Sequence, residues 1–189
     1  MPLDLGVMLT DIHKVLQASH PDYRSVLKLP ADLPLMIDAD PTRVEQIIWN
    51  LLNNALKFTP AKGRIQIIAS RCANLAQLDI VDSGLGITQQ NMGQIFDLFG
   101  QADSLRPGDH RDGLGIGLTL VRQLAEAHGG FVNVSSEGLG RGCTFTVGLP
   151  LLDALQADET QAPPQQDQAE GRLQGLKVLL GDDAIDVLE

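Results

Sequence analysis

The chain has 189 residues, of which 43% are hydrophobic and 20% are charged, and its formal net charge at pH 7 is −10. This length and composition suit one folded domain with an additional segment, and the acidic balance argues against a general affinity for nucleic acid, whose phosphates attract basic surfaces. No apolar run approaches the roughly 18 residues of a membrane helix and no signal-peptide pattern begins the chain, so we expect no direct membrane contact by this segment.

The first third of the chain alternates helical and strand patterns. A helix is predicted over residues 7–18, and short strands over 24–29 and 35–38. Asp40 and Pro41 start a second helix, because Asp caps a helix N-terminus and Pro fits its first turn. Apolar residues then recur at helical spacing, which indicates one buried face: Val44, Ile47, Ile48, Leu51, Leu52 and Ala55.

The next stretch, up to residue 150, adds four strands and one helix. Strands are predicted over residues 64–71 and 75–81, and a helix over 114–128, which ends at a pair of glycines. The last strands are expected over 131–135 and 143–149. This order predicts an α/β (α+β) two-layer sandwich, in which a mixed sheet is covered on one face by helices.

The predicted helix after Pro41 carries a polar stripe beside its apolar face. Asn50, Asn54 and Lys57 are spaced i, i+4 and i+7 and therefore share a face. Amide oxygens suit a hard cation such as Mg²⁺, and a lysine can contact a phosphate. The helix ends at Thr59. From the helix alone, a solvated polar face is the favoured alternative.

A carboxylate follows the strand that is predicted over residues 75–81. Asp82 shares the strand alternation of Leu78 and Ile80, so its side chain is expected on the buried side of the sheet. A buried carboxylate needs a hydrogen-bond partner, which the amino group of an adenine ring would supply. Gly84 and Gly86 would let the backbone approach a flat ring. An ordinary Asp-Ser-Gly turn after a strand is the alternative.

Two further glycine clusters lie at residues 113–118 and 138–145. The first runs into a predicted helix, whose N-terminal amides can hold phosphates. It does not fit a dinucleotide-binding fingerprint, because Leu118 stands where glycine is needed and no predicted strand precedes it, and it lacks the Gly-Lys-Ser/Thr of a P-loop. The second cluster alone indicates a glycine-rich hairpin between the last two strands.

The order of these motifs resembles that of sensor histidine kinases, in the GHKL group of ATP-binding domains. The resemblance covers roughly residues 3–150. It consists of an N box at residues 50–60, a G1 box at 82–86, an F box at 95–99, a G2 box at 113–118 and a third glycine box at 138–145.

The resemblance implies a site for ATP and Mg²⁺. Asn54 would coordinate Mg²⁺ with Asn50 beside it, and Lys57 would contact the phosphate chain. Asp82 would bind the adenine amino group. The other implied positions are Gly84 and Gly86 around the base, Phe96 and Phe99 in the F box, Gly113, Gly115, Gly117 and Leu118 along the phosphates, and Thr144 near the adenine end.

The same resemblance implies that a lid covers the bound ATP. It also implies that the domain is a kinase and not an ATPase. Residues 96–112 would cover the ATP, with a solvated loop as the alternative, and Asp112 departs from the glycine often found before the G2 box. In gyrase-type ATPases a glutamate one turn before the Mg²⁺ asparagine activates water. This chain has Asn50 there, and an amide cannot act as a general base. A non-catalytic nucleotide-binding module remains the alternative.

The histidines and cysteines carry no chemistry of their own in this interpretation. His13 and His20 lack the neighbours of the family's phosphoacceptor histidine, so we expect that histidine on a separate dimerisation domain of the same or a partner kinase. Cys72 and Cys143 have no metal-ligand spacing and are predicted to be reduced core residues.

The composition changes after the domain predicted over residues 1–150. Residues 151–174 are predicted to be a flexible linker, because they are rich in polar residues and proline. Residues 175–189 hold one apolar strand and an acidic pair, which resembles the truncated start of a receiver domain; an unrelated strand is the alternative. The resemblance therefore favours a hybrid kinase, with this domain in the cytoplasm and the full-length protein anchored in the inner membrane.

Overall fold

The structure, a computed structural model, describes residues 1–31, 34–97 and 116–152. Several predicted features lie outside these residues. They are the F-box residue Phe99, the glycines Gly113 and Gly115, the lid beyond Asp97, the linker after Leu152 and the receiver-like segment 175–189.

One five-stranded sheet forms the centre of the domain, with the order β2-β4-β5-β7-β6. The central three strands are β4 (Arg64–Cys72), β5 (Leu75–Asp82) and β7 (Thr144–Pro150), and the edges are β2 (Arg24–Lys28) and β6 (Phe131–Ser135). β2 is parallel to β4, and all other neighbours are antiparallel. The predicted mixed sheet is therefore confirmed, and its strand limits differ from the predicted ones by at most one residue at either end.

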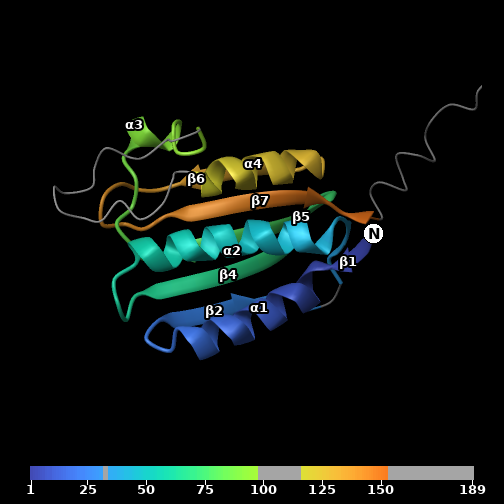
Figure 1. The fold of residues 1–189 in the computed structure, drawn as a ribbon, viewed down its shortest axis with the longest axis horizontal. Helices are drawn as coiled ribbons and strands as arrows, with labels where there is room; N and C mark the ends of the chain where they lie inside the picture. The colour runs from blue at the N-terminus through green and yellow to red at the C-terminus, as the bar shows by residue number, and fades with distance from the viewer. Residues whose placement is uncertain (32–33, 98–115, 153–189) are drawn as a thin grey trace, which may run out of the picture.

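Three helices cover one face of this sheet (Figure 1). They are α1 (Leu5–Ser19), α2 (Pro41–Phe58) and α4 (Gly117–Ala127), and α2 packs against both α4 and β5. This arrangement confirms the predicted two-layer sandwich. None of the helices in the described ranges is long and apolar enough to cross a bilayer.

The central helix α2 begins and ends where the sequence predicts. The Asp40 carboxylate accepts hydrogen bonds from the backbone N–H groups of Thr42 at 2.8 Å and Arg43 at 3.4 Å, which fixes the start. The six apolar residues predicted to face the core are all buried. A fully buried leucine or isoleucine contributes roughly 1.5–3 kcal/mol, so this face anchors the helix on the sheet.

Two short elements were not predicted. The strand β1 (Pro2–Asp4) pairs antiparallel with β3 (Met36–Asp38), and the one-turn helix α3 (Gln89–Met92) has no buried residue. Neither is long enough to show a hydrophobic period. Asp4 also caps α1 and moves its start to Leu5, two residues before the predicted start.

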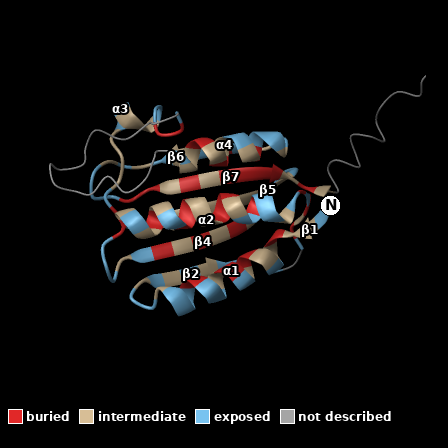
Figure 2. Ribbon diagram, in the orientation of Figure 1, coloured by how far each residue is buried: buried red, intermediate tan, exposed pale blue. Residues whose placement is uncertain are grey.

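Burial alternates along the central strands (Figure 2). In β5 the buried residues on the helix-covered face are Ala76, Leu78, Ile80 and Asp82. The other face, which we call the open face, carries polar residues among apolar ones: Thr146 Oγ1 donates to Asp79 Oδ1 at 2.6 Å. The prediction of two core cysteines is wrong for Cys72, which is exposed because it ends β4 beside a turn, whereas Cys143 is buried.

Candidate functional site

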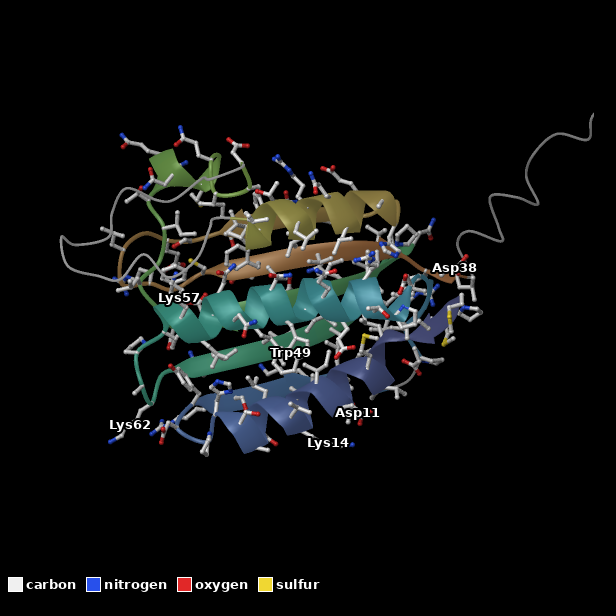
Figure 3. All side chains as sticks on the ribbon, in the orientation of Figure 1. Asp11, Lys14, Asp38, Trp49, Lys57 and Lys62 are labelled. Atoms are coloured by element: carbon white, nitrogen blue, oxygen red, sulfur yellow. The ribbon has the colours of Figure 1, made fainter. Side chains whose placement is uncertain are left out.

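Five of the predicted site residues that the structure describes lie toward one end of the helix-covered face: Asn54, Lys57, Asp82, Gly84 and Gly86. The C-terminal end of α2, the loop after β5 and the loop between β6 and β7 meet there. Figure 3 shows Lys57 at this end of α2, on the side of α3, with Asp38 at the opposite end of the molecule. The predicted residues therefore come from segments far apart in the chain.

Asp82 is a buried carboxylate at this end. Its side chain is only 7% exposed, which confirms the burial expected from the strand alternation. Its Oδ1 accepts a hydrogen bond from the Gly84 N–H at 2.7 Å. Burial raises the pKa of the Asp82 carboxyl above its ordinary value of 3.8, against the lowering effect of the Gly84 and Cys143 backbone N–H groups. Such a carboxylate can accept a hydrogen bond from a ligand amino group.

The glycines after Asp82 pack against the protein's own backbone. A Cβ on Gly84 would collide with the carbonyl oxygen of Phe58, at the end of α2. A Cβ on Gly86, whose φ is +71°, would collide with the carbonyl oxygen of Gly138. Both glycines are therefore required by the packing of the loops even without a ligand. Their predicted contact with an adenine ring stays a prediction.

Backbone hydrogen bonds join the three segments into one unit. We call residues 82–87 the first glycine loop and residues 136–143 the third glycine loop. Four bonds link these loops and α2: Leu85 N to Phe58 O at 3.1 Å, Gly140 N to Leu85 O at 2.6 Å, Gly142 N to Gly84 O at 3.1 Å and Asp82 N to Cys143 O at 2.9 Å. The surroundings of Asp82 are thus set by the fold.

Thr144 is not brought together with Asp82. It pairs directly with Val81, and paired residues share a face, so Thr144 lies on the open face whereas Asp82 lies under the helices. The neighbour of Asp82 is Cys143, which is 8% exposed. Burial, and then the charge of Asp82, raise the pKa of the Cys143 thiol to about 11.

The signal for Cys143 was present in the sequence. Cys143 shares the strand alternation of the apolar Phe145, whereas Thr144 shares that of the polar Thr146, which lies on the open face. The prediction of Thr144 came from the resemblance to the kinase family, which does not take this alternation into account.

The first residue of the polar stripe of α2, Asn50, lies beside the start of α4. Asn50 and Asn54 are half-buried and Lys57 is exposed. The Asn50 Nδ2 donates to the Gln46 carbonyl at 2.8 Å, and Asn50 Oδ1 lies 3.1 Å from the position that a Cβ on Gly117 would take. The structure therefore brings Asn50 and Gly117 together.

The charge of Lys57 and the amide of Asn54 lie one turn apart. Lys57 Nζ lies 5.3 Å from the centroid of the Phe58 ring. No hydrogen bond joins the Asn54 amide to another side or main chain in the described part of the protein.

The described part of the F box, which ends at Asp97, packs against β7 and α4. Phe96 is buried and makes an edge-to-face ring contact with Phe145 at 6.4 Å, and Asp97 forms an ion pair with Arg122 of α4 at 3.6 Å. Leu118, predicted to border the phosphates, packs its half-buried side chain against the core. Its role at a ligand stays a prediction.

The described ranges contain no preformed cluster of metal-binding side chains. They contain no group of three or more His, Cys, Asp or Glu side chains that could hold an ion. Mg²⁺ keeps several waters and binds phosphate oxygens well, so it needs few protein ligands. The half-buried amides of Asn50 and Asn54 therefore fit a cation that arrives with a phosphate chain, and not a cation bound by carboxylates.

Three comparisons with known proteins agree. The family profile of the histidine kinase-, DNA gyrase B-, and HSP90-like ATPases matches residues 39–153. The autoinducer 2 sensor kinase/phosphatase LuxQ of Vibrio vulnificus is 38% identical over 164 residues, which cover 82% of this chain and 18% of that protein. The chain thus spans less than a fifth of that relative's length.

Solved structures show the same fold. The mycobacterial sensor histidine kinase MprB, at 24% identity, has a TM-score of 0.71 over 80% of this chain and 98% of that chain. Full-length ShkA in complex with AMPPNP, at 29% identity, has a TM-score of 0.67 over 80% of this chain and 31% of that chain. The described domain therefore corresponds to a part of a longer protein in ShkA.

Proposed function

Because the chain belongs to the family of histidine kinase-, DNA gyrase B- and HSP90-like ATPases, we propose that it is the catalytic domain of a sensor histidine kinase. It binds ATP with Mg²⁺ and donates the γ-phosphate to a histidine on a separate dimerisation domain. The relatives named as sensor kinases and the fold shared with histidine kinase catalytic domains support this proposal.

The observation that carries the proposal is the buried Asp82 beside the end of α2. Its carboxylate is held by Gly84 and lies at the same end of the sheet as the polar stripe of α2. A nucleotide with its amino group at Asp82 has its phosphates along that stripe and the start of α4. The N-terminus of α4, which begins at Gly117, favours negative charge there.

Two residues of the polar stripe hold different parts of the bound Mg²⁺–ATP. Asn54 contributes an amide oxygen to the Mg²⁺, and Lys57 contributes positive charge to the phosphate chain. Bound Mg²⁺ neutralises phosphate charge and orients the γ-phosphate for an external nucleophile. Phosphoryl transfer depends mainly on such positioning and charge neutralisation, so these residues suffice without a covalent intermediate on the protein.

Asn50 favours donation over hydrolysis. Its Nδ2 already donates to the Gln46 carbonyl, and an amide has no proton-accepting group of useful basicity for activating water. We therefore expect slow ATP hydrolysis by the chain alone. The acceptor histidine belongs to another domain, since neither His13 nor His20 has the neighbours of the family's acceptor motif.

We extend the proposal to the whole protein. It is a hybrid kinase in which residues 151–174 link the catalytic domain to a receiver domain that begins near residue 175. The kinase is anchored in the inner membrane, and its catalytic domain acts on the cytoplasmic side. The full-length open reading frame would test this arrangement directly.

A transfer assay tests the catalytic claim. The chain is mixed with a dimeric helical domain that carries the acceptor histidine, ATP labelled at the γ-phosphate and Mg²⁺, and phosphohistidine is measured. We expect acid-labile label on the acceptor. A histidine-to-glutamine acceptor and the Asp82→Asn chain are the matched controls. Intact ATP binding without transfer would instead favour a non-catalytic nucleotide-binding module.

A further inference from the structure

Ser136 is a half-buried residue directly after β6 whose hydroxyl lies between the two glycine loops. Its Oγ donates to the Gly142 carbonyl at 2.7 Å and accepts from the Ile87 N–H at 3.0 Å and the Gly138 N–H at 3.3 Å. A hydroxyl has one donor and two acceptor sites. The Gly138 carbonyl lies at 3.4 Å as a second acceptor, and the hydroxyl also contacts the Cys143 thiol. The Ser136 hydroxyl therefore has its full set of hydrogen bonds, all with residues of the two loops.

The third glycine loop needs such a fixed contact. Gly140 and Gly142 have φ values of +77° and +73°. Glycine loses much conformational freedom on folding, so a loop with several glycines has many competing conformations. Ser136, the first residue of the third glycine loop, restricts these conformations because its hydroxyl bonds to Gly138 and Gly142 further along the loop. It also joins this loop to Ile87, which lies 49 residues earlier in the chain, at the end of the first glycine loop.

A short path of hydrogen bonds leads from Ser136 to Asp82. The Gly142 carbonyl accepts from Ser136, and the Gly142 N–H donates to the Gly84 carbonyl at 3.1 Å. The Gly84 N–H donates in turn to Asp82 Oδ1 at 2.7 Å. The Gly84 backbone, which holds the carboxylate, is therefore itself bonded to the third glycine loop.

We propose that Ser136 is a positioning residue for recognition of the nucleotide base. Its hydroxyl fixes the distance between the first and third glycine loops and thereby the direction of the Asp82 carboxylate. Ser136 acts at the base and not at the phosphate chain, because its hydrogen-bond partners all belong to the two loops around Asp82. The inference rests on the proposed function, since it assumes that Asp82 binds the base.

Nucleotide affinities of the full 189-residue chain test the inference. Calorimetry with Mg²⁺–ATP, Mg²⁺–ADP and Mg²⁺–GTP is compared between the wild type and Ser136→Ala. Removing the hydroxyl leaves two N–H groups without their acceptor, so we expect about a tenfold loss of affinity for ATP and for ADP alike. The ATP-to-ADP ratio stays constant, and the preference for ATP over GTP narrows.

Two further variants separate positioning from stability. Ser136→Thr keeps the hydroxyl and is expected to restore affinity and base preference. Ser135→Ala removes an exposed hydroxyl from the adjacent residue and is expected to bind as the wild type does. Wild-type affinity and base preference in Ser136→Ala would overturn the inference, and so would a loss that differs between ATP and ADP.

Ser136→Cys keeps the test decisive if Ser136→Ala does not fold. Its side chain has a similar size but is a weak acceptor, so we expect a partial loss of ATP affinity, whereas wild-type affinity would overturn the inference. If the wild-type chain binds no Mg²⁺–ATP, the proposed function fails and the inference fails with it. If the wild type binds and Ser136→Ala binds equally well, only the inference fails.

Discussion

The two ends of the candidate nucleotide site are built in different ways. At the base end, backbone hydrogen bonds join α2 and both glycine loops around Asp82. At the phosphate end, Asn54 and Lys57 stand on one face of a helix that the core already holds in place. The loops of the base end therefore hold one another in place, whereas the side chains of the stripe project from a helix whose packing does not depend on them. Substitutions at the base end should change both stability and affinity, and substitutions in the stripe should change affinity alone.

The largest effect is expected for Gly142→Ala at the base end. Its φ is +73°, and a Cβ there would collide with the carbonyl oxygen of Asp82. We expect the free energy of unfolding to fall by at least about 3 kcal/mol, because strained backbone and a steric overlap add up. Urea unfolding, followed by the fluorescence of Trp49, the single tryptophan, measures this change.

The matched control for Gly142→Ala lies in the same loop. Gly140 has a similar φ of +77°, but a Cβ there would meet no atom within 4 Å. Gly140→Ala should therefore cost only the left-handed backbone conformation, about 1–2 kcal/mol. Equal losses in the two variants would show that the contact between the loops does not limit stability.

The next largest effect is expected for Asp82→Asn. The amide donates where the carboxylate accepted, so we expect ATP affinity to fall about 100-fold, in line with the roughly 1.5–3 kcal/mol of a hydrogen bond to a charged group. Stability at neutral pH should rise, because a buried charge is removed. Calorimetry measures the affinity and thermal unfolding measures the stability; unchanged affinity contradicts the proposed role of Asp82.

The stability gain of Asp82→Asn should depend on pH. The pKa of the Asp82 carboxyl is raised in the folded protein, so the folded state binds a proton more readily than the unfolded state. Wild-type stability therefore increases as pH falls through the raised pKa toward 3.8, the ordinary value. The difference between the variant and the wild type should shrink over this range, and a difference that grows on acidification contradicts the burial argument.

A smaller effect is expected for Asn54→Asp in the polar stripe. The added negative charge repels the phosphate chain, so we expect the affinity for Mg²⁺–ATP to fall about fivefold, the scale of a single surface-accessible charge interaction of roughly 1 kcal/mol. Stability should stay within about 0.5 kcal/mol of the wild type. Asn53→Asp makes the same charge change at an exposed position of the same helix and should leave affinity unchanged.

The smallest effect on binding is expected from thiol alkylation. At pH 7.5 a thiol with a pKa of about 11 is less than about 0.1% thiolate, so the buried Cys143 should not react with iodoacetamide. The exposed Cys72 should react, and ATP affinity should stay unchanged. Mass spectrometry identifies the labelled residue; rapid labelling of Cys143 would mean that the base end opens in solution.

The parts of the site that follow from local pattern could be predicted from the sequence. The start and apolar face of α2 follow from Asp40, Pro41 and helical spacing, and the burial of Asp82 follows from strand alternation. These features depend on neighbours within a turn or a strand. The polar stripe could be located for the same reason.

The contacts between distant loops could not be predicted in this way. Ser136 and Ile87 are 49 residues apart, and no periodicity connects them. The backbone partner of Gly84 lies at the end of α2, so the sequence suggested a ligand where the structure has Phe58. The position of Cys143 beside Asp82 was predictable in principle from strand alternation, whereas Thr144 was implied only by the resemblance to the kinase family.

The preformed base end has a consequence for small molecules. A rigid fragment that presents an amino group to Asp82 meets loops that are already linked by backbone hydrogen bonds, and so loses little free energy to ordering the protein. A fragment that targets the stripe of α2 must order exposed side chains such as Lys57. Fragment screens should therefore find the higher affinity per heavy atom at the glycine loops, which makes them the better starting point for an inhibitor.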